Sequence, residues 1–230
     1  MILAAKYSFP PNKLGYCGSS SFSAALQKKE NIEEQLKTFH AYKYLALIAR
    51  ENGLDPFDDD VARAFWTGNE LLEISKEAMQ DFIMEDLLPH DRSRARKLSE
   101  NLPEGILPHH SFNVLYVQFV TDSVPRTIGN FDSCCVTAAQ VLSVAGEKAK
   151  VMRHALVWED GFAIREKEDE VDLAREGFRF VDPEKGDWIS VHWGMAIEKL
   201  DEKCLSLLQK YTKINIDACN SIPVGFNKPL

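Results

Sequence analysis

The chain has 230 residues, of which 45% are hydrophobic and 27% charged, as in ordinary folded globular proteins. Its net charge of −8 argues against a nucleic-acid partner, because phosphate binding requires a concentrated positive surface. No apolar stretch approaches the roughly 20 residues of a membrane-spanning helix, and Pro10 interrupts the start before the core of a signal peptide could form. We therefore expect a cytoplasmic protein without a membrane partner.

The first 110 residues predict a helical domain. Apolar positions recur at three- and four-residue intervals over residues 31–53, a pattern typical of an amphipathic helix. A second helix is predicted behind Asp58, and a third over residues 69–89, where an asparagine can cap its start and a proline closes it. A short polar helix over residues 91–102 follows, and a segment rich in proline and glycine then ends the helical domain.

After residue 110 the pattern changes to short runs rich in valine and aromatic residues, which are typical of strands. The runs are FNVLYVQFV, CVTAAQVLSV, AKVMRHALVW, FAIR and DWISVHW. Turn residues separate them at Gly146-Glu147, Asp160-Gly161 and 183–186, a spacing that suits a small antiparallel barrel. We therefore predict an α+β fold, with an all-α domain of residues 1–110 and a β-barrel domain of residues 111–230 that ends in a C-terminal helix.

The most specific stretch is GDWISVHWGMAIEKLDEKCLSLLQKY, residues 186–211. It combines a Gly-Asp turn, a strand end VHWG that contains His192, and a helix start LDE. Upstream, CCVTAAQVLSV places Cys134 seven residues before Val141, and a hairpin turn follows. Over about residues 132–211 these segments resemble, in the same order, the small HypC/HupF chaperones of [NiFe]-hydrogenase maturation.

The resemblance implies a small OB-like barrel with a C-terminal helix. Such a chaperone holds iron, with its cyanide and carbonyl ligands, on the way to the hydrogenase large subunit. Cys134 matches the principal ligand of the family, and His192 matches the histidine of its V-H-x-G strand end. A thiolate and a neutral imidazole are suitable ligands for low-spin iron. The chain departs from the family pattern in two respects. The family's cysteine directly follows the initiator methionine whereas Cys134 is internal, and the family's Pro-Gly after the first strand residues is Ala138-Ala139 here.

Two other cysteines are alternative ligands. Cys135 directly follows Cys134, and because neighbouring strand residues point to opposite faces, only one of the two thiols can face the site. Cys17 lies in a Gly-Tyr-Cys-Gly turn near the start of a short predicted helix, whose dipole would lower the pKa of its thiol. The plainer interpretation of Cys17 is a residue that packs in a tight turn.

The histidines also have two interpretations each. His109 and His110 stand at the domain junction, and together with His192 and Cys134 they could form a redox-inert metal site. The plainer interpretation of the pair is a solvated or backbone-bonded loop. For His192 the plainer interpretation is a strand-end residue bonded to backbone or to a carboxylate.

We therefore expect an accessory factor of hydrogenase maturation, with the hydrogenase large subunit or another maturation protein as its partner. The segments FPPNKLGYCG and DPFDDDVARAFWTGNELL also resemble an uncharacterised prokaryotic family linked to hydrogenase genes. One alternative is an enzyme in which Cys17 or Cys134, paired with His110 or His192, attacks a one-carbon or nitrile-like precursor. Another is an assembly scaffold that binds no iron. A binding protein is favoured over an enzyme, since no orienting third member of a catalytic triad is recognisable.

Overall fold

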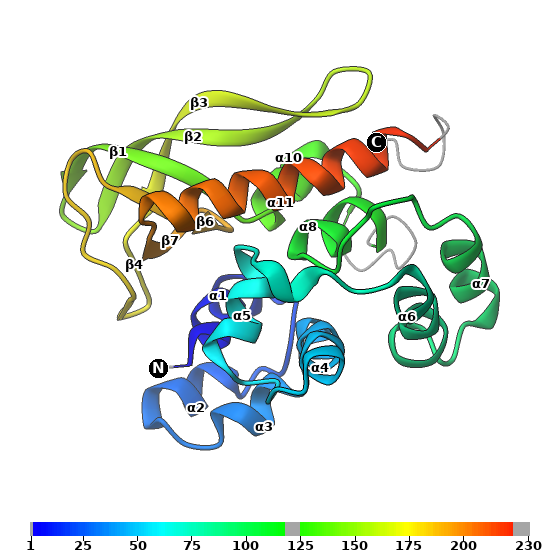
Figure 1. Ribbon diagram of the computed structural model, residues 1–230. Helices are drawn as coiled ribbons and strands as arrows, with labels where there is room; N and C mark the ends of the chain where they lie inside the picture. Colours follow the sequence, from blue (N-terminus) through cyan, green and yellow to red (C-terminus); the bar gives the residue numbers. More distant parts are fainter. Residues whose placement is uncertain (1, 118–124, 223–230) are drawn as a thin grey trace.

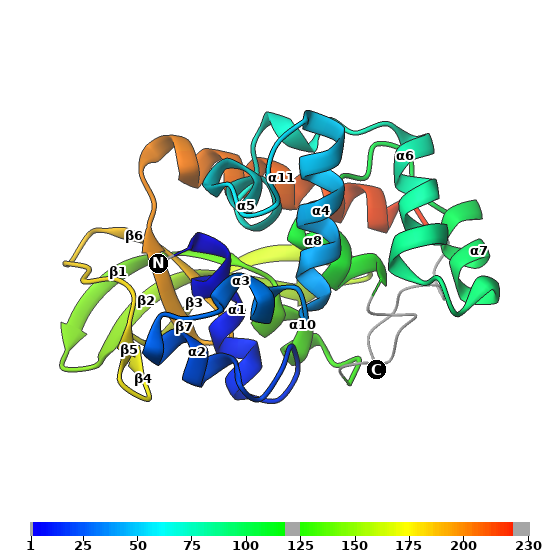
Figure 2. The ribbon, with the colours of Figure 1, turned by 90° about the horizontal axis from the view of Figure 1, so that it is seen from below.

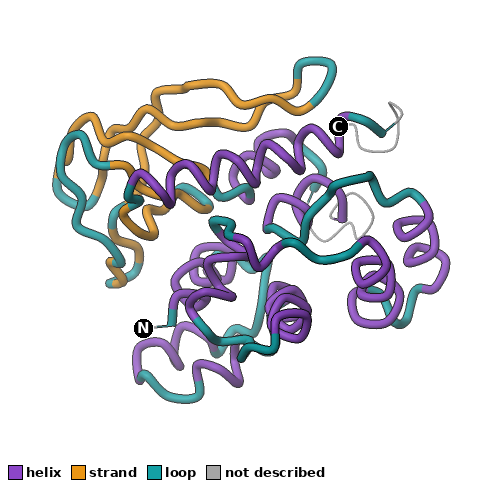
Figure 3. Tube along the Cα trace, viewed as in Figure 1, coloured by secondary structure: helices purple, strands orange, loops and turns teal. Residues whose placement is uncertain are grey.

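The computed structural model describes residues 2–117 and 125–222, in which helices form the first part and a sheet with a long helix the second (Figures 1 and 3). Among the described helices none is both long and apolar enough to cross a membrane. The helices before the sheet are α1 (Leu3–Lys13), α2 (Phe22–Lys28), α3 (Ile32–Leu36), α4 (His40–Asn52), α5 (Asp59–Trp66), the 3-10 helix η1 (Glu70–Leu72), α6 (Lys76–Asp81), the π-helix η2 (Phe82–Leu87), α7 (Arg92–Glu100), α8 (His110–Phe112), the π-helix η3 (Asn113–Val117) and α10 (Ile128–Cys134).

Local signals in the sequence predicted where helices occur better than they predicted where each helix begins and ends. The helix predicted over residues 31–53 is divided into α3 and α4, because Phe39 is extended and packs its ring against Phe22 at 4.7 Å. The helix predicted over residues 69–89 consists of η1, α6 and η2. The helix predicted over residues 91–102 is confirmed as α7, and it begins behind Asp91, whose carboxylate accepts a hydrogen bond from the backbone N–H of residue 94.

The strand predicted for FNVLYVQFV is wrong over the residues that the structure describes. Residues 112–117 belong to α8 and η3, and residues 118–120 lie outside the described part of the chain. The side chains of residues 114–117 are all buried. A continuous apolar run has no period that separates a buried strand from a helix buried on all sides. The first strand among the described residues therefore begins at Thr137 instead of near residue 111.

In the part of the chain that the structure describes, the sheet has five strands and is mixed. They are β1 (Thr137–Ala145), β2 (Lys148–Trp158), β3 (Phe162–Asp172), β6 (Trp188–His192) and β7 (Met195–Lys199), and a separate pair is formed by β4 (Ala174–Arg175) and β5 (Phe178–Arg179). The order is β1-β2-β3-β7-β6, and β6 also pairs with β1, so that the pairings form a ring. One link, between β3 and β7, is parallel, which makes the sheet mixed instead of purely antiparallel. The predicted turns at Gly146-Glu147 and Asp160-Gly161 connect the β1–β2 and β2–β3 hairpins.

A continuous hydrophobic core joins the helical part to the sheet. The predicted C-terminal helix is α11 (Glu202–Asn220), which begins behind Asp201, whose carboxylate accepts a hydrogen bond from the backbone N–H of residue 204 at 2.7 Å. Asn215 of α11 bonds to both backbone groups of Leu107 and so ties this helix to the segment before α8. On another side of the sheet, α1 packs against β7 (Figure 2). The two parts therefore meet along an extended buried contact.

Candidate metal centre

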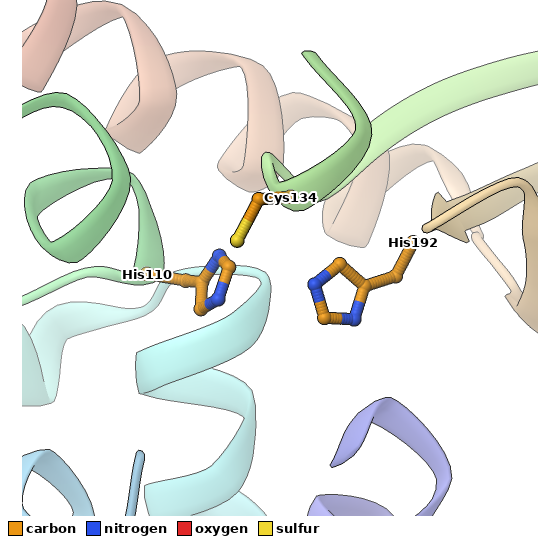
Figure 4. A group of neighbouring side chains, drawn as sticks. All are labelled: His110, Cys134 and His192. Atoms are coloured by element: carbon orange, nitrogen blue, oxygen red, sulfur yellow. The ribbon is translucent and has the colours of Figure 1, made fainter. Parts of the chain in front are cut away.

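Three side chains from three separate elements meet where the helical part joins the sheet. His110 opens α8, Cys134 ends α10, and His192 ends β6. In Figure 4 their side chains point towards one another, and one ligand atom from each lies within 4.8 Å of the others. All three residues are buried. The structure thus places together the two residues that the family resemblance selected, and adds His110, which sequence reasoning treated as an alternative ligand.

A turn at the end of β6 holds His192 next to Cys134. The backbone N–H of Trp193 donates a hydrogen bond to the carbonyl of Ser133 at 2.8 Å, which ties the strand end to the end of α10. Trp193 and Gly194 both have positive φ, at 49° and 70°, the conformation of a tight hairpin between β6 and β7. A positive φ is uncommon for a bulky residue. The Trp193 ring stacks on Tyr16 at 4.6 Å, which helps to hold it there.

The orientation of His192 depends on a backbone carbonyl of α1. Its Nδ1 lies 2.8 Å from the carbonyl oxygen of Tyr7, and because a carbonyl only accepts, Nδ1 carries the proton. In a regular helix this carbonyl would accept from residue 11, but Pro11 has no N–H to donate. The Tyr7 hydroxyl is itself 2.8 Å from both Ser190 and Glu198 of the sheet, which positions α1. The proline in the helix therefore leaves an acceptor for the histidine.

His192 is neutral at physiological pH. Burial lowers the pKa of its imidazole to about 4, against the opposing effect of the carbonyls of Tyr7 and Cys134. Its Nε2 is buried and has no hydrogen-bond partner among the described residues. A proton on Nδ1 bonded to a carbonyl, with a bare Nε2, is the usual state of a histidine that ligates a metal. The plainer interpretation of His192, a histidine bonded to backbone, is thus also correct. The residue is buried, however, with only 1% of its surface exposed.

His110 is neutral for the same reason. Burial lowers its pKa well below the ordinary value, and the neighbouring imidazoles of His192 and His109 lower it further. Its Nδ1 is buried without a partner in the described part of the chain. The ring lies 4.4 Å from that of Trp66 and 5.1 Å from that of His192. Aromatic packing, which the sequence did not indicate, therefore fixes the second imidazole.

The other predicted ligands lie outside this group. Cys135 is buried, and burial raises the pKa of its thiol. The Nδ1 of His109 bonds to the hydroxyl of Ser111 at 2.8 Å and caps α8, which is a structural role. The prediction of an activated Cys17 is wrong: α2 begins only at Phe22, and burial raises the pKa of Cys17 to about 11. No disulfide involves any of the five cysteines.

A pocket of about 350 Å³ borders the group. Its lining includes His110, Cys134 and His192, together with Tyr16 and Cys17. The three side chains supply two neutral imidazoles and one thiol, a donor set that suits zinc, copper and iron. An ion bound there would have a coordination position towards the pocket, where a further ligand can bind.

Comparison with known proteins identifies a family. No curated protein and no solved structure matches the chain. A family model described as a family of unknown function (DUF6390) matches residues 1–224. Because this match covers nearly the whole sequence, the chain belongs to that family.

Proposed function

We propose that the protein is a metal-binding accessory factor that holds a transition-metal ion through His110, Cys134 and His192. The observation that carries the proposal is the buried group of three ligand atoms within 4.8 Å of one another. Two imidazole nitrogens of this group are buried without a partner among the described residues. A buried polar atom left without a hydrogen bond costs about 1–3 kcal/mol, which a bound metal ion would recover.

We further propose that the metal is cargo, namely the iron fragment of hydrogenase maturation. Three protein ligands leave coordination positions for exogenous cyanide or carbonyl, and the adjoining pocket of about 350 Å³ leaves room for them. The resemblance of residues 132–211 to HypC/HupF chaperones supports this cargo, and the ring of five strands is compatible with their OB-like barrel. The hydrogenase large subunit or another maturation protein would then be the partner.

A second candidate is a cysteine-dependent enzyme that acts on a one-carbon or nitrile-like precursor. One observation favours it, because the Tyr7 carbonyl orients His192 as the third member of a catalytic triad would. Two others weigh against it. A general base works best with a pKa near the working pH, whereas that of His192 is about 4. Cys134 also ends α10, where the helix dipole disfavours a thiolate without a counter-charge.

The test is metal binding by variants of each ligand. The protein is purified anaerobically, its metals are removed, and its affinities for ferrous iron and zinc are measured. Cys134→Ala, His110→Gln and His192→Gln should each weaken binding by at least tenfold. The matched control is Cys135→Ala, the neighbouring buried cysteine outside the group, which should bind metal as the native protein does.

Two results separate the parts of the proposal. The metal site is refuted if all three ligand variants bind metal as the native protein does. It is also refuted if Cys135→Ala loses as much metal affinity as the ligand variants. Infrared spectra of protein isolated anaerobically from cells that make a [NiFe]-hydrogenase test the cargo. Bound cyanide and carbonyl bands that disappear in Cys134→Ala are expected. Metal binding without such bands would keep the metal centre and reject the hydrogenase cargo.

A further inference from the structure

The end of α10 is attached to the sheet at two successive residues, directly before the thiol ligand of the candidate metal centre. The carboxylate of Asp132 accepts hydrogen bonds from Nη1 and Nη2 of Arg153, each at 2.7 Å, and from the backbone N–H of Leu156 at 2.7 Å. Both donor residues lie in β2. The carbonyl of Ser133 accepts a hydrogen bond from the turn after β6 at 2.8 Å. Cys134 follows, and its side chain points towards the two imidazoles (Figure 4).

Arg153 is a rigid anchor for this attachment. Its side chain is only 8% exposed, and its strand pairs with β1 on one side and with β3 on the other. Asp169 of β3 accepts two further hydrogen bonds, from Nε at 3.2 Å and from Nη2 at 3.0 Å. The planar guanidinium therefore binds two carboxylates, each through two of its nitrogens. Such an arrangement fixes direction as well as distance.

The geometry of this ion pair matters more than its contribution to stability. Removing two charges from water costs about as much as their attraction returns, and well-packed apolar side chains of similar size often stabilise a protein equally well. An apolar contact would also hold the end of α10 against β2, but it would not fix its orientation.

A metal ligand, in contrast, has to be held within about 0.5 Å of its productive position. The other two ligands have such supports, because the carbonyl of Tyr7 orients His192 and the ring of Trp66 packs against His110. The ion pair at the end of α10 supplies the corresponding support for the thiol.

We infer that Asp132 and Arg153 are positioning residues of the metal centre, whose ion pair holds the thiol of Cys134 where it can share an ion with the two imidazoles. The inference rests on the proposed metal centre and adds to it two residues that do not touch the metal. Helix α10 spans only seven residues and ends at Cys134, so a change at Asp132 acts two residues from the thiol. Loss of the ion pair should therefore loosen the thiolate and leave both imidazoles in place.

Cobalt(II) is the probe, because a charge-transfer band in the near ultraviolet appears when a thiolate binds it, and its visible bands report the coordination geometry. The full-length protein is freed of metal and titrated anaerobically. In Asp132→Asn the amide oxygen can still accept from the backbone N–H of Leu156, whereas the charge that pairs with Arg153 is lost. The cobalt affinity of this variant should fall about tenfold, and at saturation its charge-transfer band should be weaker than that of the native protein.

A double variant with Asp132→Asn and Arg153→Met separates positioning from stability. It removes both charges of the pair, so that neither is left buried alone, and it provides the measurement if Asp132→Asn does not fold. Its cobalt affinity should be as low as that of Asp132→Asn, because the two residues act as one unit. Leu173→Ala is the control, since Leu173 is fully buried in a separate hydrophobic cluster that contains none of the three ligands. This variant should unfold more easily but bind cobalt as the native protein does.

The inference is overturned if the folded double variant binds cobalt with the affinity and the spectrum of the native protein. It is also overturned if Leu173→Ala loses as much cobalt affinity as the two pair variants, because a general loss of stability would then explain the effect. A native protein that binds no cobalt refutes the proposed metal centre and this inference with it. Normal cobalt binding by the pair variants refutes the inference alone.

Discussion

Acidification should destabilise the protein through His192, and replacement of this residue should reduce the effect. The pKa of His192 is lowered from the ordinary 6.5 to about 4 in the folded protein. The unfolded chain therefore binds more protons than the folded one between these values, and stability falls as the pH falls. The contribution of His192 is fully present above pH 6.5 and is lost as the pH decreases towards 4.

The size of this effect follows from the two pKa values. Each pH unit of difference corresponds to about 1.4 kcal/mol. On going from pH 7 to pH 5, a histidine with these pKa values removes about 2 kcal/mol from the free energy of unfolding. This is a large share of the roughly 5–15 kcal/mol by which domains are usually stable. The glutamine of His192→Gln cannot be protonated, and its amide can still donate to the carbonyl of Tyr7. Between pH 7 and pH 5 the free energy of unfolding of this variant should therefore fall by about 2 kcal/mol less than that of the native protein.

Urea unfolding at pH 7 and pH 5, in the presence of a chelator, measures this difference. The chelator is needed because a bound metal would compete with the proton for the same nitrogen. His90→Gln is the matched control, since His90 is exposed and lies outside the candidate metal centre, and it should lose as much stability as the native protein. An equal loss in the native protein and in His192→Gln would refute the reasoning that burial holds this imidazole neutral.

Two further predictions concern the supports of the fold and of the site. Pro11→Ala supplies a backbone N–H that competes for the carbonyl holding His192, and should weaken metal binding about tenfold in a protein that remains folded. Pro10→Ala, in the same helical turn, should leave metal affinity unchanged, and equal affinities in the two variants would contradict this role. Asp132→Ala leaves the guanidinium of Arg153, whose side chain is 8% exposed, without its 2.7 Å partner, and should cost about 3–5 kcal/mol in urea unfolding. A loss below 1 kcal/mol would show that the remaining contact with Asp169 is sufficient.

Much of the secondary structure follows from local signals in the sequence. Asp91 and Asp201 mark helix starts because an aspartate before a helix accepts a backbone hydrogen bond that the first turn would otherwise leave unmade. The turns at 146–147 and 160–161 locate two hairpins, since glycine or a residue with positive φ suits such tight turns. Cys134 and His192 came from the family resemblance, and spacing alone would not have selected them among the five cysteines and six histidines.

The tertiary structure decided the remaining features, because each depends on residues that are distant in sequence. Residues 112–117 form a helix instead of a strand, since the short apolar run of residues 114–117 carries no period that separates a buried helix from a buried strand. Burial, which the sequence around Cys17 does not reveal, raises the pKa of that thiol where a helix dipole was expected to lower it. His110 lies beside Cys134 because of the tertiary packing of α8, which includes the contact of its ring with Trp66. The state of His192 depends on a carbonyl 185 positions away, because a proline removed the donor that would have occupied it.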